Sequence, residues 1–397
     1  MKNNVKKLIN FFKSKELKLP SNRDNTTNFD NYLNELFENH KRLVRCLSKL
    51  PRKSSEKKVV LEKFSSVSKK KNSEQNILNI ENYKYIINEI KKGKIVSKKI
   101  SKGILRCLEK YFNGRVSDAY GIFKKTLDDK KVLNYFKKLI SNDVKKDSEY
   151  SSFSDLYRVT ATNEDLSQNP LRLFHVPYNL REKIGTNRYS IPGFPCLYLG
   201  GAAELCWREL KSPKKEKLYI TKYNVISDKL RFLNFGYTPQ FWGKLLSNPN
   251  DVIIALRKDL IVAHAVCWPL IAACSIIRKD PKSKFAPEYV IPQMLLQWIM
   301  ESKNNKEIKE EINGIRFFST KSLKKYIAIK SNVNYILPAI KSNDDNFYSS
   351  NLAKKFKIAK PILINKKNGS YFSPEDESKL KNDLGEPLMD IINNIKK

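Results

Sequence analysis

The side chains best suited to chemistry lie close together in residues 181–210. Arg188 follows Gly185 in a polar segment, Tyr198 lies near the end of a short apolar strand, and Glu209 ends a helical pattern. A guanidinium can bind phosphate through two parallel hydrogen bonds, a tyrosine ring attracts a cation, and a carboxylate stabilises positive charge. This stretch therefore predicts one pocket for a cationic ligand that carries phosphate.

The same residues belong to a longer pattern. The segments GTNRYSIPGFPCLYLGGAAELCWREL, EYVIPQMLLQW and NGIRFFST, in this order, resemble the RES domain, a family named after an arginine, a glutamate and a serine. The resemblance covers about residues 156–340. Gly200 stands where the family usually has alanine, and Phe317-Phe318 replaces a Tyr-Pro-like pair. Neither departure touches the four matching polar positions, which are Arg188, Tyr198, Glu209 and Ser319.

The resemblance implies NAD chemistry. RES proteins look like ADP-ribosyltransferases in fold, and they break down NAD or transfer ADP-ribose, commonly as toxins held by an antitoxin. We therefore expect a cytoplasmic enzyme that uses NAD as its substrate and needs no metal. It would act as a glycohydrolase, a phosphorylase or an ADP-ribosyltransferase with a protein target. An antitoxin or regulatory protein is the expected partner, and a toxin or a phage-defence effector is the expected role.

The roles of the side chains follow from the reaction. Cleavage of the nicotinamide–ribose bond passes through an oxocarbenium-like state, which Glu209 would stabilise. Arg188 would bind the pyrophosphate, and Tyr198 would stack on the cationic nicotinamide ring. Ser319 would hydrogen-bond the ribose or hold Glu209 in its rotamer. Taken singly, each has an ordinary structural alternative, so the prediction rests on their order and spacing.

Two further residues are candidate contacts for the ligand. Arg158 ends the first expected strand, LYRVTA, and is a second candidate for phosphate. His175, in the expected strand RLFHVP, is a candidate for the adenosine ribose, although a lone histidine beside a strand is more often structural.

Charge supports a rival hypothesis. The 397 residues include 76 Lys and Arg against 41 Asp and Glu, a net charge of +35 that attracts nucleic acid. The lysines are scattered among Asn, Ile and Ser, and neither a zinc-finger spacing nor an RNA-binding aromatic pattern occurs. The alternative is a basic nucleic-acid-binding protein with an inactive RES-like fold. The intact set of four polar residues argues against it.

Cysteines and apolar runs indicate the cell compartment. The six cysteines form no metal-binding spacing, and most have apolar neighbours, which is typical of buried free thiols in a reducing cytosol. No signal peptide is evident at the first residues. The most apolar window, 260–277, contains His264, Pro269 and Ser275, so we expect a buried core segment and no membrane span.

The elements that position the site form an α+β protein. Apolar residues at helical spacing recur from FDNYLNELFENHKRLVRCLSKL to KKVLNYFKKLI and predict a helical module over residues 1–150. Because this module is large and shows no catalytic set of its own, a regulatory or partner-binding role is expected for it. Residues 152–342 alternate strand and helix patterns and would form the catalytic domain, with the twisted, split sheet that the resemblance implies. Residues 343–397 are expected to be a polar tail.

Overall fold

In a computed structural model, the chain folds into two compact units. One unit combines Met1–Leu139 with Tyr237–Ile276, and the other combines Ile140–Gly236 with Ile277–Lys397. The helix expected in FDNYLNELFENHKRLVRCLSKL lies outside the described residues. These are 73–141, 155–210, 217–238, 241–242, 252–278, 284–302, 305, 307–308, 311–320, 332–343, 345–364, 378–380 and 382–395.

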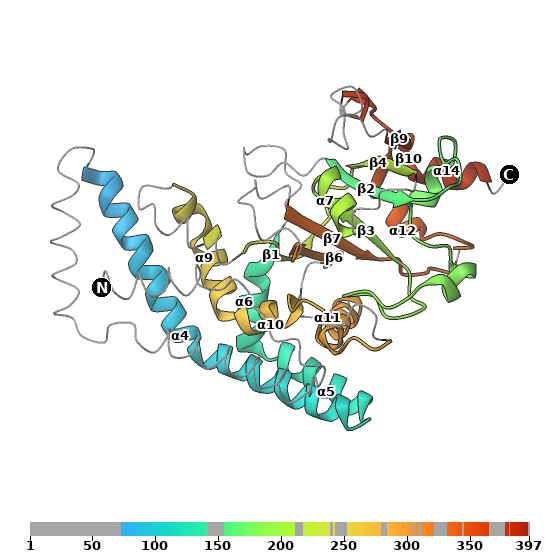
Figure 1. Cartoon of the computed structure of the whole chain (residues 1–397). Coiled ribbons are helices and arrows are strands. Elements are labelled where there is room, and N and C mark those ends of the chain that lie inside the picture. Colours follow the sequence, from blue (N-terminus) through green and yellow to red (C-terminus); the bar gives the residue numbers. More distant parts are fainter. Residues whose placement is uncertain are drawn as a thin grey trace, which may run out of the picture. The chain divides into compact units, whose positions relative to one another are not determined.

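The first unit is helical. Its 40-residue helix α4 packs against α5, α9 and α10, and α6 packs against α9 (Figure 1). Two helical patterns of the sequence, ILNIENYKYIINEI and GILRCLEKYF, are therefore parts of one helix. The described helices of this unit are α4 (Ser73–Phe112), α5 (Val116–Leu127), α6 (Lys130–Leu139), α9 (Val252–Val266) and α10 (Trp268–Cys274).

Glycines and one carboxylate hold these helices together. A Cβ on Gly93 would lie 2.2 Å from Val266 Cγ2, and a Cβ on Gly103 would lie 2.3 Å from Thr126 Oγ1. Only glycine permits such close approach of neighbouring helices. Asp259 Oδ1 accepts hydrogen bonds from Tyr85 OH and Lys138 Nζ, both at 2.7 Å, which joins α9 to α4 and α6.

The second unit is built on one twisted sheet of ten described strands (Figure 1). The strand order is β1-β5-β6-β7-β3-β2-β4-β8-β10, with β9 also paired to β4. All pairs are antiparallel except β5 with β6, and β2 meets β3 through the single pair Tyr157–Gly200. The strands are β1 (Ile140–Ser141), β2 (Asp155–Ala161), β3 (Cys196–Gly200), β4 (Leu218–Val225), β5 (Phe232–Phe235), β6 (Gly314–Phe318), β7 (Val333–Pro338), β8 (Phe356–Ile358), β9 (Ile362–Ile364) and β10 (Glu386–Pro387).

Several hydrophobic clusters form around this sheet. The largest described one includes Leu197, Leu199 and Tyr335 from the strands and Leu352 and Ile392 from helices. Another collects residues of β2, β4 and β9 with residues of α7. The helical elements of this unit are η1 (Pro170–Leu173), η2 (Tyr178–Lys183), α7 (Ala203–Glu209), η3 (Pro287–Tyr289), α11 (Val290–Glu301), α12 (Ser350–Ala353) and α14 (Leu388–Ile395).

The α+β class agrees with the expectation, but three local predictions were wrong. Residues 237–276 belong to the helical unit because α9 packs against α4 and α6. Residues 343–397 are not a tail, because they supply β8, β9 and β10 to the sheet and α12 and α14 to its core. RLFHVP forms η1 and a loop instead of a strand, since Pro170 starts a 3₁₀ turn.

The apolar window 260–277 is largely buried, as expected of a core segment. No described helix combines the length and the apolar character needed to cross a membrane. Cys107, Cys196, Cys206, Cys267 and Cys274 are free thiols, and burial raises the pKa of the Cys107 thiol to about 12. Cys46 lies outside the described residues.

The contact of α4 with α5 predicts opposite effects for two glycines. Gly103→Ala should lower the free energy of unfolding by about 1–3 kcal/mol, because the new methyl group overlaps Thr126. Gly121→Ala, on the exposed side of α5 with nothing within 4 Å, should raise it by about 0.5–1 kcal/mol through helix propensity. Urea unfolding of the full chain measures both, and equal effects would contradict the packing described here.

Candidate functional site

The site is organised around the carboxylate of Glu209, the last residue of α7. Its Oε1 atom accepts a hydrogen bond from Ser319 Oγ at 2.6 Å and another from Asn334 Nδ2 at 2.9 Å. Ser319 directly follows β6, and Asn334 lies in β7, the neighbouring strand. Hydrogen bonds to an ionised acceptor are among the stronger ones in proteins. The helix end is therefore fixed to the ends of two strands, and its carboxylate has one preferred orientation.

Gly200 brings α7 close to the sheet. A Cβ on Gly200 would lie 2.5 Å from Cys206 Sγ and 3.3 Å from the Ala202 carbonyl oxygen. The Cys206 thiol donates to the Tyr157 carbonyl oxygen at 3.1 Å, so it lies directly over β2 and β3. Glu209 is three residues further along the same helix and shares this face. The glycine at position 200 thus sets how deeply Glu209 reaches toward β7.

Arg188 lies in the loop before β3 and is held at two places. Its Nη2 donates to Thr320 Oγ1 at 3.4 Å, and its guanidinium carbon lies 5.4 Å from the ring centroid of Tyr289. Arg278 lies over the same ring at 5.9 Å. Cations attract the π face of an aromatic ring at such distances. Thr320 follows Ser319 in the chain, so Arg188 binds the residue next to the one that donates to Glu209.

Tyr198 is placed next to the loop of Arg188. Its hydroxyl and the Ser190 Oγ are 2.6 Å apart, so the two form a hydrogen bond. In the register of the sheet, Tyr198 is opposite Ile336 and Gly200 is opposite Asn334, which puts Tyr198 and Asn334 on one face. Burial raises the pKa of Tyr198, so the hydroxyl stays protonated at neutral pH. The residue as a whole keeps partial exposure.

Among the described residues, Arg158 and His175 have other surroundings than Glu209, Arg188 and Tyr198. Tyr157 pairs with Gly200, so Arg158, the next residue of β2, points to the other face of the sheet. Burial lowers the pKa of Arg158, and its Nη1 makes no hydrogen bond among the described residues.

His175 has a structural role in the second unit. Its Nε2 accepts the Ser349 N–H at 2.9 Å, which leaves the proton on Nδ1 to be donated to the Val176 carbonyl oxygen at 2.8 Å. The ring is 1% exposed, and burial lowers its pKa to about 4. Both nitrogens are occupied by the backbone, so His175 was a wrong candidate for a ribose contact.

Four contributors to the site were missed in the sequence. Asn334 is the most informative, because a polar side chain inside the apolar strand NYILPA signals a buried partner. Ser190, Thr320 and Tyr289 carry no such signal, since each is a common residue for a loop or a helix start. Their roles depend on which loops meet in the folded chain.

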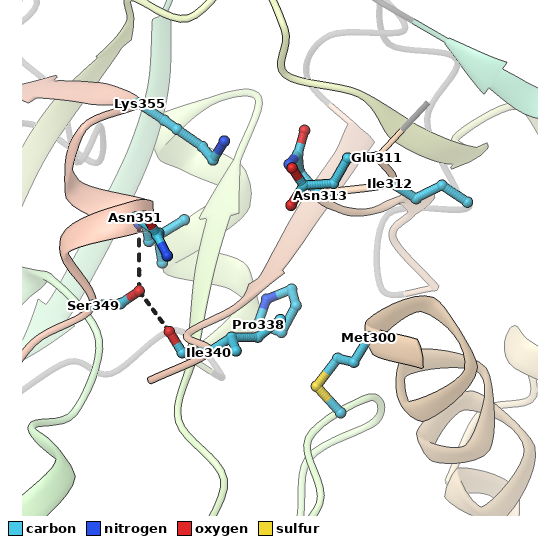
Figure 2. A pocket seen from close by; sticks show the side chains of 10 residues that line it. Met300, Glu311, Ile312, Asn313, Pro338, Ile340, Ser349, Asn351 and Lys355 are labelled. Carbon is cyan, nitrogen blue, oxygen red and sulfur yellow. Dashed lines mark hydrogen bonds between the residues drawn. The ribbon is translucent and has the colours of Figure 1, made fainter. Parts of the chain in front are cut away.

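A hollow elsewhere in the second unit is too small for a dinucleotide. Figure 2 shows its walls, which include Met300, Glu311, Ser349 and Lys355. Its cavity volume is about 50 Å³, whereas ligand pockets usually measure about 300–1,000 Å³. No group of three or more His, Cys, Asp or Glu among the described residues is arranged to hold a metal ion.

Comparison with known proteins finds one relevant similarity. The chain is 29% identical over 281 residues to a Bacillus subtilis (strain 168) protein named "Putative toxin YopC". The aligned part covers 68% of this chain and 60% of that relative, so the chain spans less than two thirds of the relative's length. No family model matches the sequence, and no solved structure matches it. The similarity points to a toxin-like family.

The contact of Gly200 with Cys206 can be tested by rescue. Gly200→Ala should lower the free energy of unfolding by about 1–3 kcal/mol, because the methyl group overlaps the sulfur. In a Cys206→Ala background the same substitution should cost much less. Gly185→Ala is the matched control, since nothing lies within 4 Å of its Cβ position. Equal costs for Gly200→Ala in both backgrounds, measured by urea unfolding, would rule out this contact as the constraint.

Proposed function

We propose that this protein is a RES-type enzyme that consumes NAD by cleaving its nicotinamide–ribose bond. One observation supports this most: Ser319 and Asn334 both donate to Glu209 Oε1, while Arg188 is bound at the adjacent Thr320. An oriented carboxylate, and a guanidinium whose partner Thr320 follows Ser319 in the chain, suit a substrate with a sugar that becomes cationic and a pyrophosphate.

The reaction would depend on Glu209. As the bond between the ribose C1′ and the nicotinamide nitrogen breaks, its electron pair goes to the ring, and neutral nicotinamide leaves. Positive charge then develops on the ribose, and the Glu209 carboxylate stabilises it. Ser319 and Asn334 are neutral donors, so they fix the carboxylate without neutralising its charge. Water, phosphate or a protein side chain then attacks C1′.

The remaining site residues would bind and orient the substrate. Arg188 would hold the pyrophosphate with parallel hydrogen bonds, in place of its present contact with Thr320. The ring of Tyr198 would stack on the cationic nicotinamide, an attraction that is lost once the ring becomes neutral. Its hydrogen bond with Ser190 holds the tyrosine in one rotamer. Binding that favours the charged ring would thus also favour release of nicotinamide after cleavage.

The similarity to a protein named as a toxin supports a harmful role for this activity. Loss of NAD, or ADP-ribosylation of an essential protein, would stop growth. An antitoxin or regulatory protein would then restrain the enzyme. The helical unit, which carries no catalytic set among its described residues, would serve this regulation or bind a partner.

The test uses the purified full chain and two glutamates of one helix. Glu209→Gln should reduce NAD consumption by about 10²–10³-fold, the usual effect of removing one charge-stabilising group. Glu204→Gln, at an exposed position of α7 paired with Arg208, should retain wild-type activity. Products are identified by mass with and without phosphate or candidate acceptors, and circular dichroism checks the fold.

The outcomes of this test are distinct. ADP-ribose, its 1″-phosphate or a modified protein as product would identify hydrolysis, phosphorolysis or transfer. The proposal fails if the wild-type chain leaves NAD intact under all of these conditions, or if Glu209→Gln remains as active as Glu204→Gln. Growth on expression gives a second measurement, because Glu209→Gln should relieve any inhibition caused by the wild-type chain.

A further inference from the structure

We infer that Gln293 of α11 is a positioning residue, which holds the loop of Arg188 so that the guanidinium is preset for phosphate. The inference rests on the proposed function and adds a residue from helix α11. Its basis is a set of contacts between α11 and the residues on either side of Arg188.

The side-chain amide of Gln293 bridges the loop. Its Nε2 donates to the Asn187 carbonyl oxygen at 3.2 Å and to the Ser190 carbonyl oxygen at 3.0 Å. These two carbonyls flank Arg188 in the chain. An NH₂ group has two hydrogens, so one glutamine can satisfy both acceptors at once. The backbone around Arg188 is therefore held on both sides by a single side chain.

Tyr289 contacts the side chain of Arg188. It is the last residue of η3 and directly precedes α11. The guanidinium carbon of Arg188 lies 5.4 Å from the centroid of its ring. The start of α11 thus contacts the charged group through Tyr289, and the helix holds the backbone of the loop through Gln293.

Ser190 links Gln293 to Tyr198. Ser190, whose carbonyl accepts from Gln293, forms a hydrogen bond with the Tyr198 hydroxyl through its own side chain. The base of the loop is closed by the Gly193 N–H, which donates to the Ile184 carbonyl oxygen at 3.1 Å. The Ser190 end of the loop is therefore held at two atoms, at its carbonyl by Gln293 and at its side chain by Tyr198, and Arg188 lies between this end and Asn187.

This geometry predicts an effect on binding more than on the chemical step. A preset guanidinium loses little conformational freedom when it binds phosphate, so the substrate binds more tightly. Arg188 would contact the pyrophosphate and not the bond that breaks. Loosening the loop should therefore raise KM while leaving kcat nearly unchanged.

The experiment compares two glutamines of α11. Gln293→Leu removes both hydrogen bonds to the loop. Gln297→Leu removes, among the described residues, a hydrogen bond to Glu301 of the same helix, at 3.3 Å. We expect Gln293→Leu to raise the KM for NAD about tenfold with kcat within about twofold, because tenfold corresponds to one lost net hydrogen bond. Gln297→Leu should match the wild type. Gln293→Glu, which keeps the size but cannot donate, should behave like Gln293→Leu and serves if that variant folds poorly.

A second measurement links Gln293 to Arg188. If Gln293 acts through Arg188, the double variant Arg188→Ala/Gln293→Leu should have the same KM as Arg188→Ala alone. Additive losses, or a fall in kcat at unchanged KM, would overturn the inference. Equal KM values for Gln293→Leu and Gln297→Leu would do the same.

Hydrogen exchange separates this inference from the proposed function. Amide exchange in residues 185–193 of the free protein should be faster in Gln293→Leu than in the wild type or Gln297→Leu, whatever the substrate is. If the wild-type chain does not consume NAD, the proposed function fails, and exchange alone decides on Gln293. Unchanged exchange in Gln293→Leu would then show that the loop does not depend on this residue.

Discussion

The candidate site depends on one hydrogen-bonded carboxylate. Glu209 ends a short helix, and the two groups that donate to it come from strands more than a hundred residues later in the chain. A partly buried carboxylate is costly unless donors compensate for its lost water, so these contacts keep helix α7 against the ends of β6 and β7. The close packing of Cys206 on Gly200 works in the same direction. The donors that stabilise the Glu209 carboxylate therefore also hold helix α7 in place.

Much of the secondary structure and part of the site could be predicted from the sequence. Regular apolar spacing gave the helices of α4 to α6, and β-branched and aromatic runs gave β2 to β7, because these patterns report which residues are buried locally. Arg188, Glu209 and Ser319 were selected by their order along the chain, and the structure brings Ser319 into contact with Glu209. The sequence could not reveal that Arg158 faces away from Tyr198, because the face of a residue depends on strand register.

Other features depend on contacts that are distant in sequence. His175 looked available, yet the Ser349 backbone, in a segment read as a tail, occupies one of its nitrogens. The domain boundary expected near residue 150 assigned α9 and α10 to the catalytic domain, whereas both helices pack against α4 of the first unit. Gly200 stands where the RES domain, which this sequence resembles, usually has alanine. The physical reason is that the Cys206 sulfur occupies the space that an alanine methyl group would need. A small residue that makes room for a larger neighbour can be recognised only when the fold shows which residue that neighbour is.

The parallel pairing of β5 with β6 has a consequence for the order of assembly. Parallel neighbours require a crossover, and here the connecting residues, 236–313, leave one compact unit, supply α9 and α10 to the other, and return as α11. Closing so long a loop costs less entropy when its middle is already folded. If α9 packs first against the helices before residue 140, the chain between β5 and β6 is shortened in effect, and less entropy is lost when these two strands pair.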